Sequence, residues 1–109
     1  SEEALAEYRT HYATPEHIHA TCNDYRAGAT YDLAADVADR ASGRMITCPT
    51  LALWGNTGIP SETDGPLNTW HEWCENVEGH GIDSGHFVAE ENPQATLAAL
   101  LPFLERHAH

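Results

Sequence analysis

The sequence contains no lysine, and five arginines supply its permanent positive charge against 17 acidic side chains. The resulting formal net charge of -12 argues against binding to nucleic acid or to anionic membrane surfaces, because both attract positively charged proteins. No run of about 18 apolar residues is present, so the sequence predicts no membrane-spanning helix. The first residues, SEEA, lack the basic and apolar regions of a secretory signal peptide.

Cysteine is also scarce, and its pattern is irregular. The three cysteines are Cys22, Cys48 and Cys74. An odd number with wide spacing and no CxxC pair does not form a disulfide framework. We therefore expect a reduced, cytoplasmic setting for the chain.

The eight histidines show no spacing typical of a metal site. Two pairs, at positions 17 and 19 and at positions 107 and 109, are two residues apart. Side chains two apart on a helix point in different directions and do not converge on one ion. With no third ligand at a suitable spacing, the sequence predicts no zinc site and no cofactor.

The first 44 residues have helical patterns. In residues 2–13 the apolar side chains recur at i, i+3 and i+7, which is typical of a helix. Thr14 followed by Pro15 predicts the start of a second helix, which we expect to stop near Gly28. Asp32 is expected to cap a third helix that Gly43 ends.

From residue 45 the pattern alternates between strand and helix. Residues 47–54 form a nearly continuous apolar run, which is typical of a strand covered on both faces. A helix is predicted from Pro66, with apolar spacing that reaches Val77, and a weaker second strand is predicted over residues 77–83. Asn92 and the proline after it cap a final helix. This βαβα order predicts an α/β fold with two parallel strands.

Two strands make a poor sheet by themselves. The apolar strand at 47–54 would leave an open edge, and such an edge promotes association with another strand. We therefore expect a homo-oligomer, or pairing with strands that this chain does not contain.

One histidine lies in a favourable position for chemistry. His86 follows the second predicted strand in the segment DSGHFV, and a histidine on a loop after a strand is a good candidate for a general base. Residues 81–85 also match the text of a G-x-D-x-G nucleophile elbow. We reject that match, because an elbow requires a helix directly after the nucleophile.

Several segments together resemble a known family. Residues 48–55 (CPTLALWG) resemble the penultimate strand of α/β-hydrolases, and SGHF followed by an acidic loop and Asn92 resembles their catalytic-histidine loop and last helix. Residues 22–29 (CNDYRAGA) and 31–33 are similar to the end of the cap domain in haloacetate (fluoroacetate) dehalogenases. The resemblance implies that residues 1–44 end a cap domain and that residues 45–109 are the C-terminal part of the hydrolase core.

The resemblance also implies roles for two residues. In such dehalogenases an aspartate displaces halide from a small haloacid and forms an ester, which a histidine-activated water hydrolyses. His86 matches that histidine, and Tyr25 matches a cap tyrosine that donates to the leaving halide.

Other parts of the family's active site have no counterpart in this sequence. The nucleophilic aspartate lies upstream of the matched region in the family, so the chain alone is expected to be inactive. The acid partner of the histidine is not identified, and Asp64 is a weak candidate. An epoxide hydrolase segment and a non-catalytic, self-associating domain remain alternatives.

Overall fold

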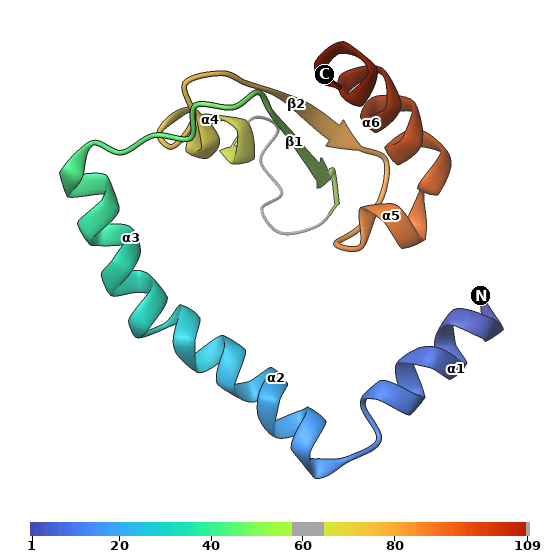
Figure 1. The fold of residues 1–109 in the computed structure, drawn as a ribbon. Coiled ribbons are helices and arrows are strands. Elements are labelled where there is room, and N and C mark those ends of the chain that lie inside the picture. The colour runs from blue at the N-terminus through green and yellow to red at the C-terminus, as the bar shows by residue number, and fades with distance from the viewer. Residues whose placement is uncertain (58–64, 109) are drawn as a thin grey trace. The chain divides into compact units, whose positions relative to one another are not determined.

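A computed structural model describes residues 1–57 and 65–108 of the chain. The chain divides into two compact units, a helical unit (Ser1–Gly43) and an α/β unit (Arg44–His109), which Figure 1 shows from the amino to the carboxyl terminus. Over the described ranges, every helix is too short or too polar to cross a membrane.

The helical unit consists of α1 (Glu2–His11), α2 (Pro15–Gly28) and α3 (Tyr31–Ser42). The predicted start of α2 is confirmed, since Pro15 is in its first turn and the Thr14 hydroxyl accepts a hydrogen bond from the His17 amide at 3.3 Å. This contact satisfies one of the amides that the first helical turn leaves unpaired.

The start of α3 differs from the prediction. Thr30, not Asp32, occupies the N-cap position, and its side chain makes no capping hydrogen bond. Asp32 lies instead in the first turn, where its negative charge interacts favourably with the helix dipole. Gly43 ends α3 as predicted, with a positive φ of 70°.

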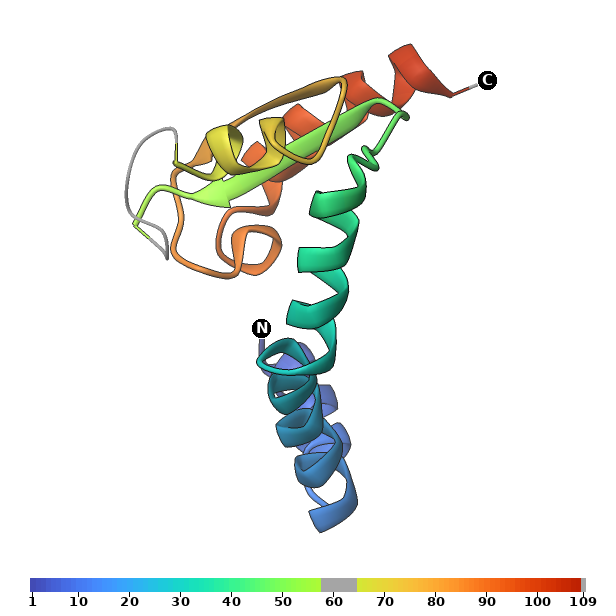
Figure 2. The same cartoon turned by 90° about the vertical axis from the view of Figure 1, so that its left-hand side faces the viewer.

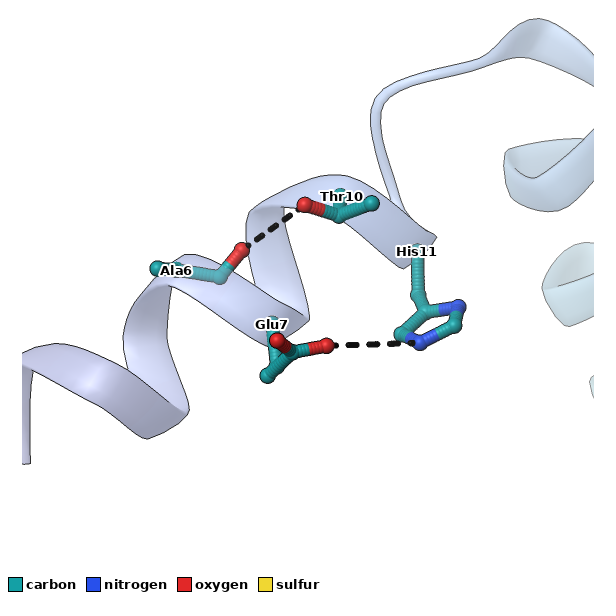
Figure 3. Close-up of polar contacts among 4 residues, drawn as sticks. All are labelled: Ala6, Glu7, Thr10 and His11. Atoms are coloured by element: carbon teal, nitrogen blue, oxygen red, sulfur yellow. Dashed lines mark hydrogen bonds and ion pairs between the residues drawn. The ribbon is translucent and has the colours of Figure 1, made fainter.

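Side-chain contacts in α1 are local. Figure 3 shows the Thr10 hydroxyl donating to the carbonyl of Ala6 at 3.0 Å, and His11 Nε2 lying 3.9 Å from a carboxylate oxygen of Glu7. Both partners of the Glu7–His11 pair are exposed, and such surface pairs contribute at most about 1 kcal/mol. Throughout residues 1–43 no side chain is buried, so this unit has no core of its own.

The α/β unit is built on two parallel strands, which confirms the predicted fold class. Its elements are β1 (Thr50–Gly55), α4 (Gly65–His71), β2 (Val77–Ile82), α5 (Val88–Glu91) and α6 (Pro93–His107). The strands pair in register from Thr50 opposite Val77 to Gly55 opposite Ile82. The predicted first strand extended back to residue 47, whereas β1 begins directly after Pro49, which has no amide hydrogen to donate to the strand pairing.

Helices cover both faces of the strand pair. In Figures 1 and 2, α4 and α6 lie on opposite sides of β1 and β2. The buried apolar residues of the described chain all belong to this unit: Ala52, Trp54, Cys74 and Ile82. An ion pair between Arg106 of α6 and Glu78 of β2 links the final helix to the sheet.

Two helix predictions in this unit require correction. Apolar spacing predicted a helix from Pro66 to Val77, but α4 ends at His71. Cys74 forms an isolated bridge with Ile46 instead, and Val77 opens β2. Cys74 is buried, at 3% exposure, and this burial explains the apolar spacing as well as a helical position would. The loop predicted before the last helix also contains a short helix, α5.

Candidate functional site

The candidate site is the histidine loop, residues 83–87, which directly follows β2. Because β1 and β2 are parallel, this loop lies at the edge of the sheet where the carboxyl ends of both strands meet. In open α/β sheets, ligands bind outside the carboxyl ends of the strands. His86 therefore occupies the edge at which a functional side chain is expected.

Residues after β1 fix one side of the loop. The Asn56 amide donates to the Ile82 carbonyl at 2.9 Å. The Thr57 amide and hydroxyl both donate to the Ser84 carbonyl, at 3.1 and 2.9 Å. Two donors on one carbonyl leave Ser84 little freedom to move, and its side chain is buried.

Gly55 brings the two segments into direct contact. A Cβ atom at this position would overlap the carbonyl oxygen of Gly85 and lie 2.8 Å from the carbonyl oxygen of Ser84. Only glycine permits such a close approach of two backbones. Gly55, the last residue of β1, is thus required by the packing of the histidine loop.

Glu91, which ends α5, and Asn92, the N-cap of α6, fix the other side of the loop. The carboxylate of Glu91 accepts hydrogen bonds from the Gly85 amide at 2.6 Å and from the Phe87 amide at 3.1 Å. The side-chain amide of Asn92 donates to the carbonyl of Asp83 at 3.1 Å, while its oxygen accepts from the Ala95 amide and caps α6. These contacts fall on both sides of His86.

These hydrogen bonds also set the charge state of Glu91. The amides of Gly85 and, to a smaller extent, Phe87 stabilise the carboxylate anion and lower the pKa of Glu91 from its ordinary value of 4.5. The positive charge that His86 can carry lowers it further, and partial desolvation opposes the shift. Glu91 is therefore an anion at neutral pH.

The His86 ring itself is exposed. Its imidazole packs edge-on against the ring of Phe87, with 5.0 Å between centroids and 81° between ring planes. An accessible imidazole on a firmly bonded loop can take a proton from a bound water and return it. Within the described ranges, no cluster of three or more His, Cys, Asp or Glu residues could bind a metal ion.

The acid partner of His86 stays unassigned. The residue directly after β1 is Asn56, which cannot serve as an acid, and Asp64 lies outside the described residues. Tyr25 lies on α2 in the helical unit, with 79% of its surface exposed. His86 belongs to the α/β unit, so the two predicted site residues come from different units.

The sequence interpretation missed the contacts made by Glu91 and Asn92. In the sequence Glu91 stands only as part of an acidic loop before the last helix, but its carboxylate points back to the histidine loop. The acid lies six positions after the glycine of the loop, and that spacing alone does not indicate a contact between them. Asn92 was correctly predicted to cap α6, whereas its bond to Asp83 was not foreseen.

The chain is similar in sequence to known hydrolases. A fluoroacetate dehalogenase from a Burkholderia species is 34% identical over 102 residues, covering 94% of this chain and 33% of that protein. A soluble epoxide hydrolase from a Corynebacterium species is 34% identical over 106 residues, covering 94% of this chain and 34% of that protein. No family model matches the chain.

Solved structures resemble the chain closely. A candidate epoxide hydrolase from Pseudomonas aeruginosa has a TM-score of 0.89 and 39% identity, over 99% of this chain and 36% of that one. A candidate α/β hydrolase from Nostoc has a TM-score of 0.88 and 44% identity, over 95% of this chain and 35% of that one. A candidate acyltransferase from Salmonella enterica has a TM-score of 0.88 and 41% identity, over 98% and 35%.

The solved structures all match the fold of the chain, but the activities named for them differ. The chain is homologous to α/β hydrolases and has part of the α/β-hydrolase fold. It spans about a third of the length of the curated relatives it matches.

Proposed function

We propose that this chain is the C-terminal segment of a hydrolase of the haloacetate dehalogenase type. In this scheme an aspartate outside the chain attacks the α-carbon of a small haloacid, and the carbon–halogen bond breaks as the carbon–oxygen bond forms. His86 then takes a proton from water, whose oxygen attacks the carbonyl carbon of the aspartyl ester. The position of His86 on a loop bonded from both sides, after a parallel strand, is the observation that carries the proposal.

Tyr25 is proposed to act in the first step. Its phenol can donate a hydrogen bond to an anion, and the departing halide is an anion that needs such a donor. The large exposure of Tyr25 leaves its hydroxyl available for this contact. Residues 1–44, which include Tyr25, are proposed to form the end of a cap domain, and residues 45–109 the last part of the core.

An epoxide hydrolase is the second candidate, because a soluble epoxide hydrolase matches the chain at the same identity as the dehalogenase. In that reaction aspartate opens an epoxide ring, and a tyrosine supplies the proton that the new alkoxide requires. His86 would again activate water against the ester. A cap His-Trp pair upstream would favour halide as the leaving group, and a second cap tyrosine would favour an epoxide.

The segment is further proposed to be inactive alone and to associate through its open sheet. In the described part of the chain β1 pairs only with β2, and Leu97, Leu101 and Leu104 of α6 are about half exposed. A homo-oligomer, or pairing with the missing core strands, would cover these groups. We also propose a cytoplasmic setting, on the irregular cysteine pattern, and the absence of nucleic-acid and membrane partners, on the net charge of -12. A non-catalytic, self-associating domain would show the same association without any activity.

Fluoride release from fluoroacetate tests the proposal. The chain alone should release none, whereas the enzyme that joins this segment to a nucleophilic aspartate should release fluoride continuously. His86→Ala in that enzyme should stop turnover and leave a covalent ester detectable by mass spectrometry. His80→Ala is the matched control, because His80 is an exposed histidine on β2 and should leave turnover unchanged.

Three outcomes would contradict parts of the proposal. Fluoride release by the isolated chain, lost on His86→Ala, would show that no external nucleophile is needed. Hydrolysis of epoxides but not of haloacids by the joined enzyme would favour the second candidate. Light scattering that shows a compact monomer would contradict the proposed association.

A further inference from the structure

The carboxylate of Glu91 bridges the backbone on both sides of His86. One oxygen accepts from the amide of Gly85 at 2.6 Å, and the other accepts from the amide of Phe87 at 3.1 Å. Hydrogen bonds to an ionised acceptor are roughly twice as strong as those between neutral groups. The residue between the two donors is His86, so the carboxylate holds the backbone before and after the imidazole, at the Ser84–Gly85 and His86–Phe87 peptide units.

The surrounding residues favour this contact. A Cβ atom on Gly85 would lie 2.8 and 2.9 Å from the two carboxylate oxygens of Glu91, so a side chain there would push the carboxylate away. The Glu91 amide also donates to the Phe87 carbonyl at 2.9 Å. Phe87 and Glu91 are thus joined by two hydrogen bonds of opposite direction, which restricts rotation of the peptide after His86.

We propose that Glu91 is a positioning residue for His86, which keeps the imidazole oriented toward the ester while water attacks. This inference rests on the proposed function of His86 as the water-activating base. Glu91 itself does not contact substrate in this scheme. Its carboxylate acts through the backbone of the histidine loop, and this distinguishes it from an acid that orients the ring directly.

A helix cap without a functional role would use the same two hydrogen bonds, so the test needs two measurements. The first is a pH titration of the chain followed by amide NMR resonances. Gly85 and Phe87 should shift with one common midpoint below 4.5, because both amides donate to the same carboxylate. The titratable side chains of the neighbouring loop are Asp83 and His86, so the titration is repeated in Asp83→Asn and in His86→Ala, where the acidic midpoint should persist.

Three variants sharpen the first measurement. Glu91→Gln should remove the common midpoint, and the adjacent Glu90→Gln should keep it. Glu91→Asp retains a carboxylate but is one methylene shorter, so one of the two amides should lose its shift. Unchanged amide resonances of Leu51 and Leu53 in β1 would show that each variant is folded. Separate midpoints for Gly85 and Phe87 in the unmodified chain would overturn the proposal.

The second measurement separates positioning from capping. In the enzyme that joins this segment to its nucleophile, Glu91→Gln should slow hydrolysis of the ester by roughly tenfold, because small misplacements of a catalytic group can cost up to about 100-fold. The first halide released per enzyme should appear at an unchanged rate. Ester hydrolysis at the unmodified rate in folded Glu91→Gln would overturn the positioning role. Failure of the unmodified enzyme to form any ester would instead contradict the proposed function. The NMR titration would still test the carboxylate contacts of Glu91, because it does not depend on turnover.

Discussion

The two units of this chain are stabilised by contacts of different range. In the helical unit, side-chain hydrogen bonds such as those between Thr14 and His17 and between Thr10 and Ala6 join residues three or four positions apart. In the α/β unit the Thr57 hydroxyl reaches Ser84, 27 positions away, and Arg106 pairs with Glu78, 28 positions away. The buried apolar residues of the described chain lie only in the α/β unit.

This difference distinguishes structure that local sequence signals can form from structure that tertiary packing must stabilise. Helices with good caps form wherever the sequence supplies them, but a helix derives most of its stability in a protein from packing of an apolar face. The apolar faces of α1, α2 and α3 remain exposed, so the helical unit depends on further protein surface. The α/β unit, by contrast, already contains the core that fixes the candidate histidine.

The largest expected difference between the units comes from two isoleucines. Ile82 at the end of β2 is 3% exposed, and Ile18 on α2 is 53% exposed. Ile82→Ala should destabilise the α/β unit by about 3 kcal/mol, because it removes buried methyl groups and leaves a cavity. Ile18→Ala should change stability by less than about 0.5 kcal/mol. Urea unfolding followed by tryptophan fluorescence measures both, and equal effects would contradict the comparison.

Gly55→Ala should have the next largest effect. The new Cβ would overlap the Gly85 carbonyl oxygen, and neither backbone can move without breaking the hydrogen bonds of the loop. Overpacking of this kind costs about 1–3 kcal/mol. Gly28→Ala is the matched control, since a Cβ there meets no atom within 4 Å. Hydrogen exchange of β1 and β2 amides should accelerate only in Gly55→Ala, and protection equal to that of the unmodified chain would refute this packing.

The same distinction explains what could be predicted from sequence. Thr14, Pro15, Gly43 and Asn92 mark helix ends through local chemistry, and the structure confirms each of them. The apolar spacing at Cys74 was ambiguous, because burial by a distant bridge to Ile46 produces the same pattern as a helix face.

The candidate site shows the same limit. The position of His86 after a strand was predictable from the glycine turn and the resemblance to α/β-hydrolases. The contacts of Glu91 and Asn92 were not, because they depend on how α5 turns back toward the loop. No local pattern distinguishes an acid that caps a helix from one that bonds to a loop six residues earlier.

Two N-caps provide a smaller test of the comparison. Thr14→Ala removes a local bond to His17 and should cost about 1 kcal/mol of helix stability. Asn92→Ala removes a similar bond to Ala95 and also the bond to Asp83 in the histidine loop, so its cost should be about 2 kcal/mol. Circular dichroism measures the loss of helix in both. Amide resonances of residues 83–87 should shift only in Asn92→Ala, and a shift of equal size in Thr14→Ala would contradict the local character of the Thr14 cap.

The smallest expected effect is a dependence of stability on pH at Glu91. Its pKa is lowered in the folded chain, so the anion contributes stability that is fully present above its unfolded pKa. That contribution is lost as pH falls through the lower, folded pKa. The free energy of unfolding of the unmodified chain minus that of Glu91→Gln should therefore be constant near neutrality and shrink below 4.5. Urea titrations of both chains between neutral and acidic pH give this difference, in which the titration of the other carboxylates cancels. A difference that grows on acidification would mean that folding raises the pKa of Glu91, so that its carboxylate does not accept these two hydrogen bonds as an anion, and the histidine loop would then need another anchor.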